Sequence, residues 1–230
     1  WAIEINPRYA PVYSMRGLLK QATGDLQGAL ADQTRALELD PKLEIAFVNR
    51  GVVRERLTDA AGAIADYTKA LEIDPRYLPA LTARSHARTS SGDVPGALAD
   101  ATKAIELAPR TGPLYGSRGY LYYDAGEWRE SLRDLQEAVA LGLPADARDY
   151  ARMRIHLLSR RLGEKDDLAA YLGTRKDGNA WALDVLRFLA GQAAEKEFLG
   201  RAGDIAEKRC EAFFYAGTRR LLAGDKAEAR

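Results

Sequence analysis

The sequence has few of the residues on which several classes of site depend. Its 230 residues include one cysteine, Cys210, and two histidines, His86 and His156. A single thiol excludes a disulfide within the chain and a zinc site built on cysteine pairs. The 34 Lys and Arg are balanced by 33 Asp and Glu. The chain therefore lacks the basic excess that binding to nucleic acid phosphates requires.

The sequence also lacks the patterns of catalysis and of membrane insertion. No run of 18 apolar residues is present, so no membrane-spanning helix is predicted. No phosphate-binding glycine loop occurs, and no nucleophile has a base placed beside it. Cys210 adjoins the apolar segment EAFFYAG, which favours a buried structural cysteine. We therefore predict no enzyme activity, no cofactor and no metal site.

What the sequence does contain is one phrase repeated every 34 residues. The phrase reads AIEINP, ALELDP, ALEIDP and AIELAP in its four copies, which end at residues 7, 41, 75 and 109. Three further columns of small residues recur at the same period. A 34-residue period with a turn signal near each midpoint is typical of helical hairpins that stack on their neighbours.

We number each repeat so that its proline is position 32, and the repeats then begin at Ala10, Glu44, Leu78 and Gly112. In each repeat, helix A leads to a turn (TGD, LTD, SGD or AGE), and helix B runs to the proline, which ends it. Small residues at positions 8 and 20 allow the two helices to approach closely and pack antiparallel. The prediction is an all-α fold of antiparallel helix hairpins.

The regularity sets the predicted organisation of the chain. Residues 1–143 form a regular array, with a partial repeat at 1–9 followed by the four repeats. Residues 144–230 hold irregular helical repeats and end in a truncated repeat, with small residues at Gly217, Gly224 and Ala229. Because the sequence begins and ends inside a repeat, we expect a fragment of a longer protein.

Two charged columns run through the repeats. Position 7 is always arginine and position 23 is always aspartate. We predict that each arginine pairs with the aspartate of its own hairpin, so that the pairs form a structural ladder. The eight residues are Arg16, Asp32, Arg50, Asp66, Arg84, Asp100, Arg118 and Asp134.

The best copy, FVNRG (47–51) followed by AIADYTKALEIDP (63–75), resembles the tetratricopeptide repeat (TPR) family, and the resemblance extends over residues 10–143. It implies a right-handed superhelical solenoid whose concave groove binds a protein or peptide. In the family, positions 2, 5, 9 and 12 of helix A line this groove. The candidate groove residues carried over are Ser14, Leu18, Gln21, Val48, Val52, Glu55, Thr82, His86, Thr89, Tyr120 and Tyr123, with Pro11, Ile45, Pro79 and Pro113 at position 2.

The candidate groove is neutral to apolar. It lacks the Lys, Asn and Arg pattern with which the family holds a C-terminal carboxylate, so a chaperone C-terminus is a poor candidate ligand. Tyr120 and Tyr123 suit peptide recognition, because tyrosine buries a large area and keeps a hydroxyl. Together with His86 and Val52 they are the predicted site. The alternative is that the tyrosine pair packs on the irregular hairpin that follows.

The second part of the chain carries weaker signals. The arginines of ARDYARMRIHLLSRR (147–161) spread around a helix, which favours a solvated face over a nucleic acid site. Trp181, LRFLAG (186–191) and CEAFFYAG (210–217) resemble bacterial TPR proteins that include NlpI-type lipoproteins. This resemblance implies export to the periplasm or envelope, with the cytoplasm as the alternative.

The function predicted from these patterns is a non-enzymatic scaffold that binds a partner segment in the concave groove. The alternative is the TPR region of a larger enzyme or envelope assembly protein, which it positions or oligomerises. A third reading is a homo-oligomer formed through the helix that carries Phe213, Phe214 and Tyr215.

Overall fold

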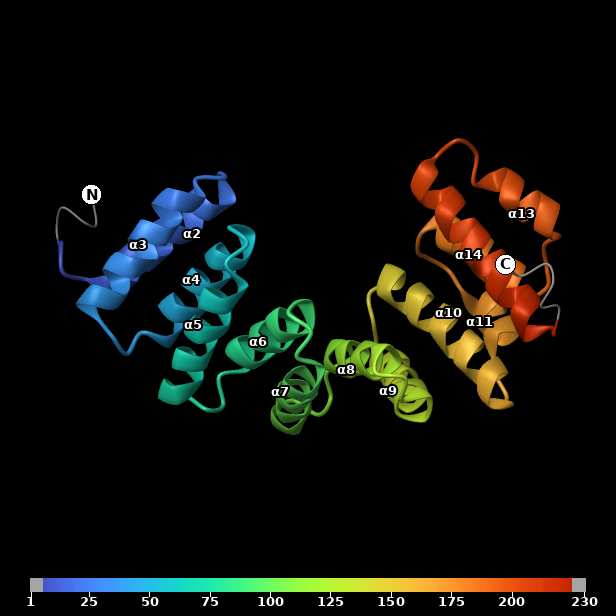
Figure 1. Cartoon of the computed structure of the whole chain (residues 1–230), viewed down its shortest axis with the longest axis horizontal. Helices are drawn as coiled ribbons and strands as arrows, with labels where there is room; N and C mark the ends of the chain where they lie inside the picture. The colour runs from blue at the N-terminus through green and yellow to red at the C-terminus, as the bar shows by residue number, and fades with distance from the viewer. Residues whose placement is uncertain (1–5, 225–230) are drawn as a thin grey trace. The chain divides into compact units, whose positions relative to one another are not determined.

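The computed structural model describes residues 6–224. Within that range, all regular secondary structure is α-helical. The contacts group the chain into two units, residues 1–109 and 110–230. The first unit holds α2 (Ala10–Ala22), α3 (Leu26–Leu39), α4 (Glu44–Arg56), α5 (Ala60–Ile73), α6 (Leu78–Ser90) and α7 (Val94–Leu107), as Figure 1 shows. Three helices begin at the first residues of the predicted repeats. The predicted all-α array of hairpins is confirmed.

Within the first unit, α4 and α6 each contact both the B helix before them and the A helix before that. Position 6 and position 13 face the preceding hairpin: Asn49 Nδ2 donates to Ser14 Oγ at 3.1 Å, and Arg56 Nη1 donates to the carbonyl of Gln21 at 2.9 Å. Position 10 lies between them on the same stripe, and Val53 is 0% exposed there. The hairpins are therefore stacked on a shared core.

The turn inside each of these hairpins is closed by an aspartate cap. Asp25, Asp59 and Asp93 begin the B helices, and each accepts a hydrogen bond from the backbone N–H three residues later at 2.9–3.0 Å. The cap satisfies a helix N–H that would otherwise lack a partner. The residue before the cap has a left-handed backbone. It is a glycine in the first and third repeats and Thr58, with φ of 63°, in the second.

We expect Thr58→Gly to stabilise the protein by about 1 kcal/mol, because a side chain in the left-handed region is strained and glycine removes that strain. Urea denaturation followed by circular dichroism measures the gain. Thr23→Gly is the matched control, because Thr23 has φ of −88° and a glycine there relieves no strain. Each substitution also removes one hydrogen bond from a threonine hydroxyl to a backbone carbonyl. Equal effects of the two substitutions would contradict this account.

The second unit combines one regular hairpin with five less regular helices. The hairpin is α8 (Gly112–Asp124) and α9 (Trp128–Leu141). The following helices are α10 (Ala145–Leu162), α11 (Leu168–Thr174), α12 (Ala180–Leu189), α13 (Glu195–Arg201) and α14 (Ala206–Leu222). Helix α10 packs on α9, and α12 contacts α10, α13 and α14. The fourth repeat thus continues directly into the irregular helices.

The main core of the second unit gathers around α12. Phe188 and Phe198 stack with ring centres 4.3 Å apart, and Trp181 stacks on Phe198 at 5.5 Å. Met153 of α10 and Tyr215 of α14 belong to the same cluster. The Trp181 ring N–H donates to Glu211 at 2.6 Å. These contacts join helices that the 34-residue period does not relate.

Two expectations for α14 are wrong. Cys210 is exposed rather than buried. Helix α14 packs through Ala212, Tyr215 and Ala216, and Cys210 lies two residues before Ala212, about 200° around the helix. Tyr215 is 7% exposed and therefore belongs to the core. The sequence had predicted that it forms an interaction surface together with Phe213.

The calls that fall at the chain ends lie outside the described residues. These are the start of the partial repeat, residues 1–5, and the second helix of the last repeat, including Ala229. Within residues 6–224, no helix is long and apolar enough to cross a bilayer.

Candidate functional site

In each repeat, the position-7 arginine lies against the position-23 aspartate of the same hairpin. Arg50 Nε and Nη2 donate to the two carboxylate oxygens of Asp66 at 3.0 and 2.7 Å. The other three pairs share this bidentate geometry, with donor–acceptor distances of 2.5–3.0 Å. The four aspartates are 2–4% exposed. Paired hydrogen bonds of this kind compensate a buried charge and fix the two helices relative to each other.

A second cation contacts the same aspartate in the first three repeats, and the sequence analysis missed it. The cation occupies position 11, as Lys20, Arg54 and Arg88, and lies 2.8–2.9 Å from the carboxylate. The signal was visible as a third charged column at the 34-residue period. In the fourth repeat position 11 is Tyr122, and the Arg118 guanidinium lies 5.7 Å from its ring centre.

We expect the stability difference between wild type and Asp32→Asn to narrow in acid. Burial alone would raise the pKa of Asp32, but hydrogen bonds from Arg16 and Lys20 outweigh it and hold the pKa below its ordinary value. Such a group stabilises the fold above its unfolded pKa, about 3.9, and ceases to do so as pH falls through the lower folded pKa. Urea midpoints measured on both proteins from neutral pH to below about pH 4 test this. A difference that widens on acidification would contradict it.

The close approach of helices A and B involves position 24 as well as positions 8 and 20. A Cβ added to Gly51 would lie 2.4 Å from the Tyr67 ring, and one added to Gly17 would lie 2.6 Å from the Gln33 amide. In the third repeat the two positions are instead Ser85 and the small Ala101. There, Ser85 Oγ donates to the carbonyl of Ala97 at 2.9 Å. A glycine at position 8 is thus paired with a large residue at position 24, and the larger Ser85 is paired with a small alanine.

The candidate groove residues of the first unit lie on three adjacent A helices, but at different depths. Ser14 and Val48 at position 5 are buried, at 4% and 8% exposed. The hydroxyls of Thr82 and Thr89 are satisfied by carbonyls of their own helix. The accessible surface therefore comes from the other positions. Leu18 is 40% and Ile45 is 42% exposed.

Position 12 of the second repeat links three helices. Glu55 accepts a hydrogen bond from the Tyr67 hydroxyl at 2.6 Å, and its other oxygen lies 3.5 Å from His86 Nδ1. Burial and the Glu55 carboxylate raise the pKa of Tyr67. Glu55 is therefore held in place, with a quarter of its side chain exposed, beside the exposed His86. We call the surface made by Leu18, Ile45, Val52, Glu55 and His86 the A-helix face.

The predicted tyrosine pair packs within the second unit. Tyr120 and Tyr123 lie against the cluster formed by α9 and α10. The Arg154 guanidinium of α10 lies 5.7 Å from the Tyr120 ring centre and 4.0 Å from that of Tyr123. This is the packing on the following hairpin that the sequence offered as the alternative. Val52 and His86, the other two residues of the predicted site, belong to the first unit.

Comparison with known proteins relates two of these hairpins to a family. Residues 10–43 and 46–77 match the family model of the tetratricopeptide repeat. The comparison with curated proteins found no match. A TPR protein of Parabacteroides merdae ATCC 43184 is similar in structure, with 16% identity, a TM-score of 0.68 and coverage of 96% of this chain and 89% of that one.

Two further solved structures are similar. YrrB, a TPR protein with an unusual peptide-binding site, has 21% identity, a TM-score of 0.57 and coverage of 86% of each chain. The first TPR of Spaghetti (RPAP3), solved with the HSP90 peptide SRMEEVD, has 22% identity and a TM-score of 0.50 over 51% of this chain and 94% of that one. Together with the family model, these structures show the fold to be an all-α array of tetratricopeptide repeats.

Proposed function

We propose that the chain is a non-enzymatic scaffold whose A-helix face binds a partner segment. The observation that carries the proposal is a group of apolar side chains on two adjacent A helices. Leu18 and Val52 occupy position 9 of α2 and α4, and Ile45 occupies position 2 of α4; Leu18 and Ile45 are exposed and Val52 is partly exposed. Glu55 and the exposed His86 lie at the end of this group. Exposed apolar surface on a rigid scaffold with a few polar groups is suited to peptide recognition. The HSP90 peptide bound to the first TPR of RPAP3 and the peptide-binding site of YrrB support peptide binding by proteins of this fold.

The charges of the A-helix face indicate the chemistry of the partner. Among its five residues Glu55 is the one acidic side chain, and none is Lys or Arg. A carboxylate held in place by Tyr67 can accept hydrogen bonds from a ligand, whereas an acidic ligand would be repelled. The partner segment is therefore apolar with a neutral or basic polar group.

Selection from a displayed 12-residue peptide library, followed by fluorescence anisotropy with the selected peptides, tests the proposal. Leu18→Glu is expected to weaken binding about tenfold or more, because it places a second acid on the apolar row. Leu19→Glu is the matched control: it makes the same change on the next residue, which is 69% exposed on another face of α2. Peptides that bind both variants equally well would place the binding surface elsewhere.

A second candidate function, self-association, is favoured by a separate observation. Phe213 and Phe214 on α14 are 58% and 55% exposed, and large exposed aromatic side chains are typical of interfaces. Light scattering of wild type and of Phe213→Ser/Phe214→Ser across a range of concentrations distinguishes the two functions. If the wild type stays monomeric at every concentration, self-association is excluded, and the scaffold that binds another protein remains.

A further inference from the structure

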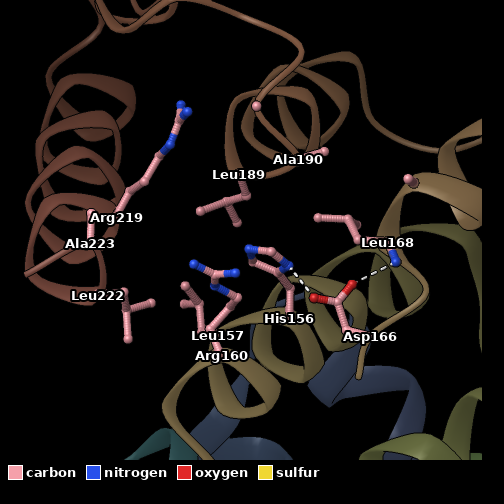
Figure 2. A pocket seen from close by; sticks show the side chains of 12 residues that line it. His156, Leu157, Arg160, Asp166, Leu168, Leu189, Ala190, Arg219, Leu222 and Ala223 are labelled. Atoms are coloured by element: carbon pink, nitrogen blue, oxygen red, sulfur yellow. Dashed lines mark hydrogen bonds and ion pairs between the residues drawn. The ribbon is translucent and has the colours of Figure 1, made fainter. Parts of the chain in front are cut away.

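The second unit contains a cavity that none of the sequence patterns indicated. It has a volume of about 440 Å³ and lies between α10, the segment before α11, the end of α12 and α14 (Figure 2). A volume of this size is in the range of binding pockets for small ligands and peptide side chains. All its lining residues belong to the second unit, so the cavity is separate from the A-helix face.

One wall of the cavity carries a histidine held by a carboxylate. His156 Nδ1 and Asp166 Oδ2 are 2.7 Å apart, and the two side chains are 13% and 14% exposed. Because an ionised carboxylate only accepts hydrogen bonds, Nδ1 is the donor. The other carboxylate oxygen accepts the backbone N–H of Leu168 at 2.7 Å, which fixes Asp166. Figure 2 shows the remaining ring nitrogen on the side away from Asp166, facing Arg160.

Two arginines line the cavity without a carboxylate partner among the described residues. Four of the five arginines in residues 147–161 contact carboxylates or aromatic rings; Arg148, for instance, pairs with Asp177. Arg160 and Arg161 are exposed, as a solvated face predicts. The fifth, Arg160, makes no such contact within residues 6–224. Arg219 donates to the carbonyl of Phe188 at 2.9 Å and lies 4.6 Å from its ring centre, so its partners are uncharged.

The lining therefore combines an excess of positive charge with an apolar floor. Arg160 and Arg219 stand against one acid, Asp166, which is already paired. The floor is formed by Leu157, Leu168 and Leu189, each of which is 3–6% exposed. Arg160 is exposed and Arg219 is partly buried. Guanidinium groups favour carboxylate or phosphate oxygens, and the leucines favour an apolar group attached to them.

We propose that this cavity binds an acidic peptide segment in which a carboxylate adjoins an apolar side chain. The carboxylate accepts hydrogen bonds from Arg160 and Arg219 beside His156, and the apolar side chain packs on the leucine floor. A simple inorganic anion would leave the floor unused, and an uncharged apolar ligand would give the two guanidinium groups no acceptor. The ligand has the opposite charge preference to that proposed for the A-helix face, and the two sites share no residue.

The test uses two peptides that differ in one group, acetyl-Gly-Leu-Leu-Glu-Leu-Gly-amide and its Glu→Gln counterpart, titrated into the full chain and followed by methyl NMR. The Glu peptide is expected to shift the methyl signals of Leu157, Leu168 and Leu189 and the ring signals of His156. The Gln peptide is expected to bind at least about tenfold more weakly. Equal binding of the two peptides, or shifts confined to other residues, would overturn the proposal.

Arg160→Gln is the informative variant, because Arg160 is exposed and makes no hydrogen bond, ion pair or ring contact within residues 6–224 that its loss could disturb. It is expected to weaken binding of the Glu peptide about tenfold. Arg133→Gln, which removes an exposed arginine of α9 that does not line the cavity, is expected to leave binding unchanged. Equal weakening by both variants would show a non-specific charge effect and overturn the site. Inorganic phosphate that binds as tightly as the Glu peptide would overturn the peptide assignment.

Discussion

Asp149→Ala is expected to destabilise the second unit by about 4 kcal/mol, which would leave little of the stability typical of a small domain. The Asp149 carboxylate is 0% exposed and accepts hydrogen bonds from Arg175 Nε and Nη2 at 2.9 and 2.6 Å and from the Tyr171 hydroxyl at 2.5 Å. The Arg175 side chain is only 7% exposed. Removing the aspartate would leave the guanidinium buried without its counter-ion.

Urea denaturation followed by tryptophan fluorescence measures this loss, because Trp128 and Trp181 both lie in the second unit. Asp146→Ala is the matched control: it removes an exposed aspartate from the same helix and is expected to cost less than about 1 kcal/mol. Asp149→Ala/Arg175→Met removes both charges, so it should recover much of the loss. A double variant no more stable than Asp149→Ala would show that the ion pair is not the cause.

Gly51→Ala is expected to destabilise the first unit by about 3 kcal/mol, because the added methyl would overlap the fully buried Tyr67 ring. The effect should depend on that ring. In a Tyr67→Ala background, where the second repeat resembles the third, Gly51→Ala should cost less than about 0.5 kcal/mol. Urea denaturation followed by circular dichroism gives the four stabilities of this double-mutant cycle.

Gly173→Ala is a suitable control for the effect of replacing a helical glycine with alanine where no side chain is close. Gly173 lies in α11 with nothing within 4 Å of the position of an added Cβ, so alanine there should stabilise the helix by up to about 1 kcal/mol. If Gly51→Ala is destabilising to the same extent with and without Tyr67, the close approach of the two side chains would not explain the glycine.

Most of the regular array was predictable because each of its contacts is repeated. A residue column at a 34-residue period identifies a position in the hairpin, and four copies show which changes are tolerated. The arginine–aspartate contacts, for example, join positions 7 and 23 in every copy. The position-11 cations and the match between positions 8 and 24 were equally present as columns, and recognising them required the geometry of the hairpin.

The second unit was less predictable because its contacts occur once. Asp149 meets Arg175, and Trp181 meets Glu211, across 26 and 30 residues with no second copy to reveal the pairing. The cavity could not be predicted for the same reason, because His156 and Arg219 line it from helices that no period relates. The burial of Tyr120 likewise depends on α10, which lies outside the repeats. The resemblance of this region to NlpI-type lipoproteins stays a prediction.

The match between positions 8 and 24 also bears on how similar repeats avoid pairing with the wrong neighbour. Helix A of the third repeat, placed on helix B of the second, would press Ser85 into the space of Tyr67. The reverse exchange would set Gly51 opposite Ala101 and leave an empty volume. Sequence-similar modules are prone to misassembly and domain swapping. Here overlap in one mispaired hairpin and a void in the other disfavour the exchange, so the helices of the third repeat are sterically distinguished from those of the second.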